Sequence, residues 1–253
     1  MISHPAFPVE PWAIRETELQ LDKLAQTESV FALSNGHIGL RGNLDEGEPY
    51  GIPGTYLGGF YEVRPLPYAE AGFGYPEDGQ TVVDVTNGKI LRLLVEDEPL
   101  DVRYGVLNHH ERVLDLRDGV LRRSVHWTSP TDRQVRVTST RLVSFTQRAV
   151  AGVEYVVEAV DGSFPVVVQS ELVANEAGGP TSDDPRAASA LAAPLEAEVH
   201  DHNGLQGILV HHTRQSGLRI AAGMHHIVEG PEGTETTGEA FPDTARIVIT
   251  ADL

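Results

Sequence analysis

The chain has 253 residues, of which 40% are hydrophobic and 22% charged, a composition typical of a soluble globular protein. Acidic residues outnumber lysine and arginine by 37 to 19, and the net charge of −18 argues against binding to nucleic acid or to an anionic membrane. The sequence has no cysteine, which excludes disulfides, thiol nucleophiles and cysteine metal sites and favours a cytoplasmic location.

The N-terminal region is rich in glycine. Residues 19–29 are compatible with one or two helical turns and equally with a strand. Gly36, Gly39 and Gly42 then recur at every third position within an otherwise apolar stretch. Glycine weakens a strand unless the backbone must turn or lie close to another surface, so we expect one of these here. The spacing matches neither the dinucleotide-binding nor the Walker motif, and a nucleotide site is not expected.

Within this stretch, Asn35-Gly36 predicts a primed turn, and residues 38–40 form the returning strand. Arg41 and Asn43 follow, and their donors suit carboxylates or sugar hydroxyls. Two interpretations stay open. The two side chains contact substrate or a neighbouring domain, or Arg41 pairs with a local acid and serves only the structure.

A second glycine-rich stretch covers residues 53–62 and contains two tyrosines and a carboxylate. As a strand it would alternate, with Thr55, Leu57 and Gly59 on one face and Tyr56, Gly58 and Phe60 on the other. Aromatic rings with a polar group beside a carboxylate are typical of sugar-binding surfaces, and also of ordinary sheet edges. Tyr56, Tyr61 and Glu62 are therefore candidate binding residues.

From about residue 80, alternating β-branched segments dominate. The expected strands are 82–86, 90–95, 120–128, 135–145, 153–160, 166–173, 195–199, 208–210, 218–228 and 247–250. Turn signals separate them at 87–88, 118–119, 129–130, 161–162 and 230–231. We therefore predict an all-β, antiparallel fold of two packed sheets or a barrel, in one domain spanning residues 1–253. A short helix is expected from Asp184-Pro185 to Leu191, after a loop at 178–182.

The histidines do not predict a metal site. Adjacent strand residues point to opposite faces, so the pairs at 109–110, 211–212 and 225–226 cannot each chelate one ion. His200 and His202 share a face, but two imidazoles are one ligand short of a catalytic zinc site. No nucleophile or metalloprotease motif is present, and we expect no cofactor.

Several segments together resemble glycoside hydrolase family 65. The first runs from Phe31 to Asn43, followed by Glu46, and the second from Gly54 to Glu62. Trp12 is similar to an early tryptophan of the family, and the segments 112–122 and 141–145 are similar to two of its later motifs. One departure is Gly58, where the family pattern has asparagine.

The resemblance implies a β-super-sandwich of galactose-mutarotase-like architecture with one or two short helices. It also implies that the catalytic (α/α)6 barrel, with the general acid and the phosphate site, lies outside this chain. The chain is then a non-catalytic N-terminal domain that supports the barrel, shapes the pocket entrance and takes part in homodimerisation. The parent enzyme would cleave α-linked glucose disaccharides by phosphorolysis, with inorganic phosphate as co-substrate, or by hydrolysis.

On this interpretation no catalytic residue is expected in the chain. The candidate substrate-binding or barrel-interface residues are Asn35, Gly36, Arg41, Asn43, Tyr56, Tyr61 and Glu62. Two other classes of protein stay possible. A free-standing carbohydrate-binding β-sandwich needs no barrel, and a mutarotase-type sugar epimerase would use a histidine with a carboxylate.

Overall fold

The computed structural model describes residues 7–66, 73–176 and 192–253, and these form antiparallel β-sheets with very little helix. A 3-10 turn, η1 (Leu21–Lys23), leads into one short helix, α1 (Leu24–Val30). The helical alternative for residues 19–29 is therefore confirmed. The helix expected at 184–191 and its preceding loop lie outside the described residues.

The two main sheets hold eleven strands. The six-stranded sheet has the order β1 (Val9–Glu10), β2 (Ala13–Glu16), β10 (Val106–Asp115), β11 (Val120–Thr128), β12 (Gln134–Val143) and β13 (Ala151–Ala159). The five-stranded sheet has the order β18 (Glu235–Phe241), β19 (Thr244–Asp252), β14 (Pro165–Val173), β8 (Asn87–Val95) and β9 (Glu98–Pro99).

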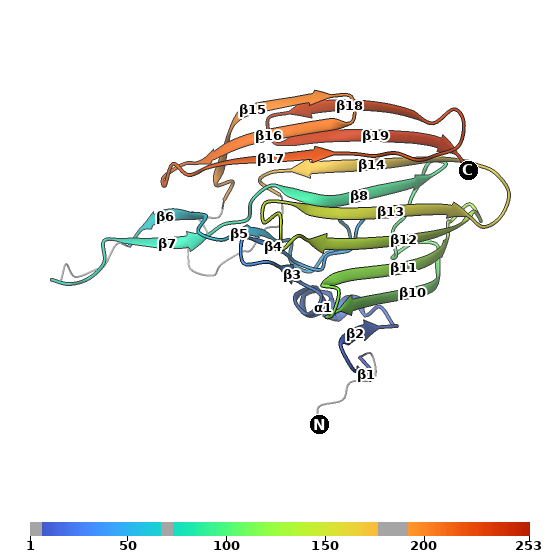
Figure 1. Ribbon diagram of the computed structural model, residues 1–253, viewed down its shortest axis with the longest axis horizontal. Coiled ribbons are helices and arrows are strands. Elements are labelled where there is room, and N and C mark those ends of the chain that lie inside the picture. The colour runs from blue at the N-terminus through green and yellow to red at the C-terminus, as the bar shows by residue number, and fades with distance from the viewer. Residues whose placement is uncertain (1–6, 67–72, 177–191) are drawn as a thin grey trace.

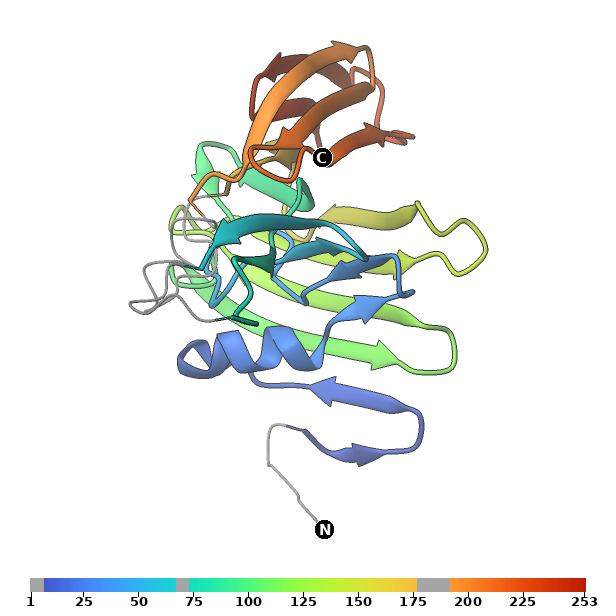
Figure 2. The same ribbon diagram turned by 90° about the vertical axis from the view of Figure 1, so that its left-hand side faces the viewer.

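Three small sheets complete the fold. The three-stranded sheets are β15 (Leu195–Asn203), β16 (Gln206–Thr213) and β17 (Arg219–His225), and β3 (Leu33–Ser34), β4 (Ile38–Leu40) and β5 (Thr55–Leu57). The two-stranded ribbon of β6 (Tyr61–Pro65) and β7 (Asp78–Val82) projects from one end of the molecule (Figure 1). Figure 2 shows β1, β2 and α1 at one end and the β15–β17 sheet at the other.

The largest hydrophobic core lies between the two main sheets. Trp127 of β11, Val137 of β12 and Tyr155 of β13 belong to the same cluster as Leu93 of β8 and Val166 of β14. These strands alternate buried and exposed positions because only one face of each meets the other sheet. The alternation visible in the sequence therefore identified this core.

Several details of the predicted strand pattern are wrong. Residues 83–86, expected to lie in a strand, belong to none, because β7 ends at Val82. Asn87-Gly88 forms no hairpin turn, because β8 begins at Asn87 and pairs with β14 and β9, whereas β7 pairs with β6. The alternation expected across residues 53–62 stops at Gly58, because the chain turns at Gly59, whose φ is +83°. Phe60 therefore shares a core cluster with Leu57 instead of facing away from it. No helix among the described residues is long and apolar enough to cross a membrane.

Candidate functional site

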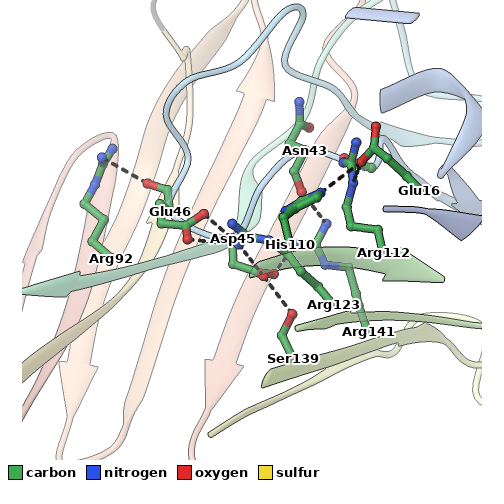
Figure 3. Close-up of polar contacts among 11 residues, drawn as sticks. Glu16, Asn43, Asp45, Glu46, Arg92, His110, Arg112, Arg123, Ser139 and Arg141 are labelled. Carbon is green, nitrogen blue, oxygen red and sulfur yellow. Dashed lines mark hydrogen bonds and ion pairs between the residues drawn. The ribbon is translucent and has the colours of Figure 1, made fainter. Parts of the chain in front are cut away.

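Buried ion pairs fasten the first glycine-rich stretch to the six-stranded sheet (Figure 3). Asp45 accepts hydrogen bonds from Arg141 at 2.7 Å, Arg123 at 3.1 Å and Ser139 at 2.7 Å. Glu46 accepts from Arg123 at 2.8 and 2.9 Å. All four charged side chains are at most 4% exposed.

The two carboxylates of this network have opposite pKa shifts. Burial raises the pKa of Asp45, but Arg141 and Arg123 outweigh it and hold that pKa below its ordinary value. Burial raises the pKa of Glu46 above its ordinary value, because Arg123 offsets the loss of hydration only in part and Asp45 adds repulsion. Asp45 is thus the firmly ionised partner, and the charge on Glu46 depends on Arg123.

Arg112 joins four segments of the fold at a second buried point. Its guanidinium donates to Glu16 of β2 at 2.6 Å, to the Gly42 carbonyl at 2.8 Å and to the Thr27 hydroxyl of α1 at 3.0 Å. It also lies 4.7 Å from the centre of the Phe31 ring. The N-terminal strand, the helix and the glycine-rich stretch are therefore positioned by one side chain of β10.

The charged side chains point inward because they occupy core-facing positions of their strands. Arg123 lies two and four residues before Val125 and Trp127, on the same face of β11, and Arg112 is directly opposite Arg123 in the register of β10 and β11. Leu121 continues this face on the other side of Arg123, so the charged group lies between two apolar clusters. Charged residues at inward positions were visible in the sequence as breaks in the alternation, but their partners at residues 45 and 46 were not.

Asn35 and Gly36 make the predicted turn between β3 and β4. Gly36 has a φ of +82° at the first central position, as a mirror-image hairpin turn requires. The Asn35 side-chain oxygen accepts from the His37 and Ile38 amides, both at 2.8 Å. Its side-chain nitrogen donates at 2.6 and 2.9 Å to carbonyls of the β12–β13 connection. Asn35 therefore anchors the turn to the six-stranded sheet.

Arg41 is engaged within the domain. Its guanidinium donates to the Ala25 carbonyl at 2.7 Å, to the Ser29 hydroxyl at 2.9 Å and to the Ile52 carbonyl at 2.9 Å, and it lies 3.6 Å from Glu28. These contacts match the local alternative considered from the sequence. Whether Arg41 also contacts a neighbouring domain stays a prediction.

Asn43 is 8% exposed and donates to the Ile52 carbonyl at 3.0 Å. Gly42, its neighbour, lies against the Phe31 backbone, where a Cβ atom would come within 2.7 Å of the Phe31 carbonyl oxygen. The close backbone approach expected of the glycines is therefore made at Gly42 to another segment of this domain, and not to a neighbouring domain. At Gly58, similarly, a Cβ atom would lie only 2.8 Å from the Gly36 carbonyl oxygen, so asparagine there requires the turn to shift.

The second candidate group does not form one site. Glu62 is 2% exposed and accepts from the Gln215 and Ser216 amides at 2.8 to 3.2 Å, which fixes the turn after β16. The Tyr61 carbonyl accepts from the Ser216 hydroxyl at 2.7 Å. Tyr56 lies elsewhere, on the face of β5 opposite Thr55, and burial and the nearby Asp84 raise its pKa to about 12.

Around Tyr56 the structure gathers two ionisable groups that the sequence did not single out. Burial raises the pKa of Asp84 to about 6, and neither carboxylate oxygen has a hydrogen bond of normal geometry to a described residue, although the Tyr56 hydroxyl is close. Burial lowers the pKa of Lys89 to about 7. Lys89 donates to Gly54, Thr55 and Asn87 at 2.9 to 3.2 Å.

Ionisable groups whose pKa values are shifted strongly by burial and by neighbouring charges are concentrated at functional sites. Tyr56, Asp84 and Lys89 therefore make the best candidate site among the described residues, with Arg41 close enough to lower the pKa of Asp84. Of the seven candidates from the sequence, the structure brings Tyr56 and Arg41 to this cluster. Asp84 and Lys89 were visible in the sequence as an acidic residue and a lysine within apolar, strand-like segments. Such residues are common, so this pattern did not identify them as site residues.

Three of the described histidines lie beside acidic side chains. His110 lies 3.1 Å from Glu16 and His211 lies 3.0 Å from Asp243, and these imidazoles are 3% and 0% exposed. His212 contacts Glu196 and Glu198 at the surface. Within the described ranges, no three histidine or acidic side chains are grouped so that they could hold a metal ion.

Comparison with known proteins covers almost the whole chain. Residues 14–253 match the family model described as glycosyl hydrolase family 65, N-terminal domain. An uncharacterized glycosyl hydrolase from Mycobacterium leprae is 64% identical over the entire chain, which spans 32% of that relative. The α,α-trehalose phosphorylase of Thermoanaerobacter brockii is 31% identical over 97% of the chain, which again spans 32% of the relative.

A solved structure has the same fold. A putative kojibiose phosphorylase from the human microbiome superposes on 98% of this chain with a TM-score of 0.82 at 20% identity, and the match covers 31% of that protein. The chain thus spans about a third of the length of the relatives that it matches. It belongs to glycoside hydrolase family 65, and it corresponds to the N-terminal domain of that family.

Proposed function

We propose that the chain is the non-catalytic N-terminal domain of an enzyme that cleaves α-linked glucose disaccharides. The observation that carries the proposal is the match to the α,α-trehalose phosphorylase, which aligns with nearly all of the chain but extends over three times its length. A maltose phosphorylase from Bacillus subtilis is 28% identical over 70% of the chain. Phosphorolysis, with inorganic phosphate as co-substrate, is therefore favoured over hydrolysis.

In this proposal the packed sheets form the β-super-sandwich of the family, and the remaining two thirds of the protein hold the catalytic barrel. The buried ion pairs of Asp45 and Glu46 support it physically, because they hold this segment on the six-stranded sheet. The adjoining cluster at Tyr56 and Asp84 is the part of this domain that would face the barrel and the pocket entrance. Homodimerisation and a cytoplasmic location stay predictions.

The test compares the 253-residue chain with the full-length protein. Each is incubated with trehalose, maltose or kojibiose and inorganic phosphate, and release of glucose 1-phosphate and of glucose is followed. We expect the full-length protein to release glucose 1-phosphate from one of these sugars and the chain alone to release nothing. The proposal is wrong if the chain alone turns over a disaccharide, or if the full-length protein cleaves none of the α-glucosides.

The same samples separate the alternative classes. A mutarotase needs a histidine and a carboxylate that reach the sugar. His110 and His211 are buried, which leaves His212, beside Glu196 and Glu198 at the surface, as the accessible pair among the described residues. We expect the chain to leave the rate of α-glucose anomerisation, measured by polarimetry, unchanged. A free-standing carbohydrate-binding protein would bind maltose or trehalose without the barrel, and calorimetry on the chain alone is expected to show no such binding.

A further inference from the structure

Two separate sheets cover the same face of the five-stranded sheet. On β14, Val166 packs against the six-stranded sheet and Leu172 packs against β16. These residues are six apart and therefore lie on one face of the strand. On β19, Ala251 belongs to the same core cluster as Val166, and Ala245 belongs to the same cluster as Leu172. The covering layer is therefore made of two parts, one on each half of the five-stranded sheet.

A cleft of about 520 Å³ lies where these two parts meet. Its walls are β13 and β17, each the last strand of its sheet, and its floor is formed by β8, β14 and β19 of the five-stranded sheet. In Figure 1, β14 and β8 are seen between β17 and β13. Side chains that line the cleft from these strands include Tyr155 and Val157 of β13, Val166, Val168 and Leu172 of β14, and Ile249 of β19.

The cleft leaves both apolar side chains and main-chain groups uncovered. Ile227, which follows β17 and lines the cleft, is 89% exposed. On the side away from their known partners, β12 and β16, neither β13 nor β17 pairs with another strand among the described residues. Free strand edges and aliphatic surface together are the features that bind an extended segment by strand addition.

We propose that the cleft holds an extended, apolar segment from the part of the full-length protein that lies outside this chain, paired with the free edge of β13. The inference rests on the proposed function, since it takes its occupant from the remaining two thirds of the protein. The relatives supply such a length of chain, because this domain spans only 32% of them. β13 is nine residues long, and its exposed and half-buried positions alternate. A bound segment could therefore pair along the free edge of β13 while its apolar side chains pack into the cleft.

The test uses single cysteines, since this chain has none of its own. Any cysteine elsewhere in the full-length protein is replaced by serine. Ala151→Cys on β13 and Ala221→Cys on β17 place thiols on the two walls, and both alanines are exposed in the domain. Ala197→Cys on β15 is the matched control, because Ala197 is exposed in the same sheet as Ala221 but does not line the cleft.

The measured quantity is the rate of maleimide labelling in the native full-length protein, divided by the rate in denaturant. We expect Ala151→Cys and Ala221→Cys to react at least about tenfold more slowly than Ala197→Cys, because covered positions react only through local opening. Hydrogen exchange is expected to show protection for those β13 amides that do not bond to β12. A circular dichroism spectrum equal to that of the parent protein confirms that each variant is folded.

Three results overturn the proposal. Equal labelling at all three positions means that the cleft is open. Protection that disappears on dilution identifies a second copy of the protein as the occupant. Thiol protection with fast exchange along β13 excludes strand pairing. If the thiols and amides are protected but no disaccharide is cleaved, the proposed function fails and the docking inference stands.

Discussion

Removing Arg123 tests whether the buried ion pairs hold the glycine-rich stretch on the sheet. Its side chain is 4% exposed and donates to both Asp45 and Glu46. In Arg123→Met, Asp45 keeps Arg141 and Ser139, but Glu46 loses the guanidinium that offsets its burial. Breaking a buried pair by removing one partner costs about 3–5 kcal/mol. This is a large part of the roughly 5–15 kcal/mol that stabilises a domain.

The assay is urea unfolding of the 253-residue chain at neutral pH, followed by circular dichroism and by the fluorescence of the buried Trp127. Arg136→Met is the matched control, because Arg136 is exposed on the neighbouring strand, and we expect a change within about 0.5 kcal/mol. Adding Glu46→Gln to Arg123→Met is expected to restore part of the lost stability, since no unpaired charge is then buried.

The pH dependence of Arg123→Met adds an independent check. The pKa of Glu46 is already raised in the intact network, and losing Arg123 raises it further. A carboxyl whose folded pKa lies above its unfolded value lowers stability as the pH rises, so the deficit should shrink between pH 8 and pH 5. A deficit below about 1 kcal/mol, or one that the control shares, would refute the reasoning.

Four further changes are expected to act in defined directions. Lys89 has a folded pKa of about 7, so stability should rise from pH 7 toward pH 10, and Lys89→Met should flatten that rise in urea titrations. Asp84 has a folded pKa of about 6, and Asp84→Asn should raise stability at pH 7 by about 1–2 kcal/mol, an effect that disappears near pH 4. Arg41→Ala should lower the melting temperature of the chain, through the loss of three hydrogen bonds worth roughly 1 kcal/mol each; an unchanged melting temperature would instead favour the interface role. Gly42→Ala should cost about 1–3 kcal/mol, because its Cβ would meet the Phe31 backbone, whereas Gly39→Ala at a roomier position should cost less.

The strands of the main core could be predicted from the sequence because their alternation reports which side chains are buried. β11 was predicted with its observed bounds, and β12, β13 and β14 within a few residues. β10 and β18 were missed as strands, because β10 carries two histidines and an arginine in its middle and β18 is rich in threonine and glutamate. β18 is largely exposed, and β10 buries the paired side chains of His110 and Arg112, so neither strand shows the alternation of apolar and polar residues used to predict strands.

The candidate site was predictable only in part. The glycines at 36 and 42 indicated a turn and a close approach, and both are present. The partner of the approach was not predictable, because contact between Gly42 and Phe31 depends on how α1 packs on the sheet. Asp84 and Lys89 acquire shifted pKa values only through burial, which the sequence does not show for a lone charged residue.

The sequence by itself determined the fold class, the absence of cysteine chemistry and, through its ordered motifs, the family. Those properties follow from composition, from the two-residue period of strands and from local turn chemistry. Tertiary structure alone decided which charges meet. Asp45 and Arg123 are 78 residues apart in the chain, and their pairing depends on the register of three strands. It also decided that the layer over the five-stranded sheet is divided, because sequence alternation tells which face of a strand is buried but not which sheet covers it.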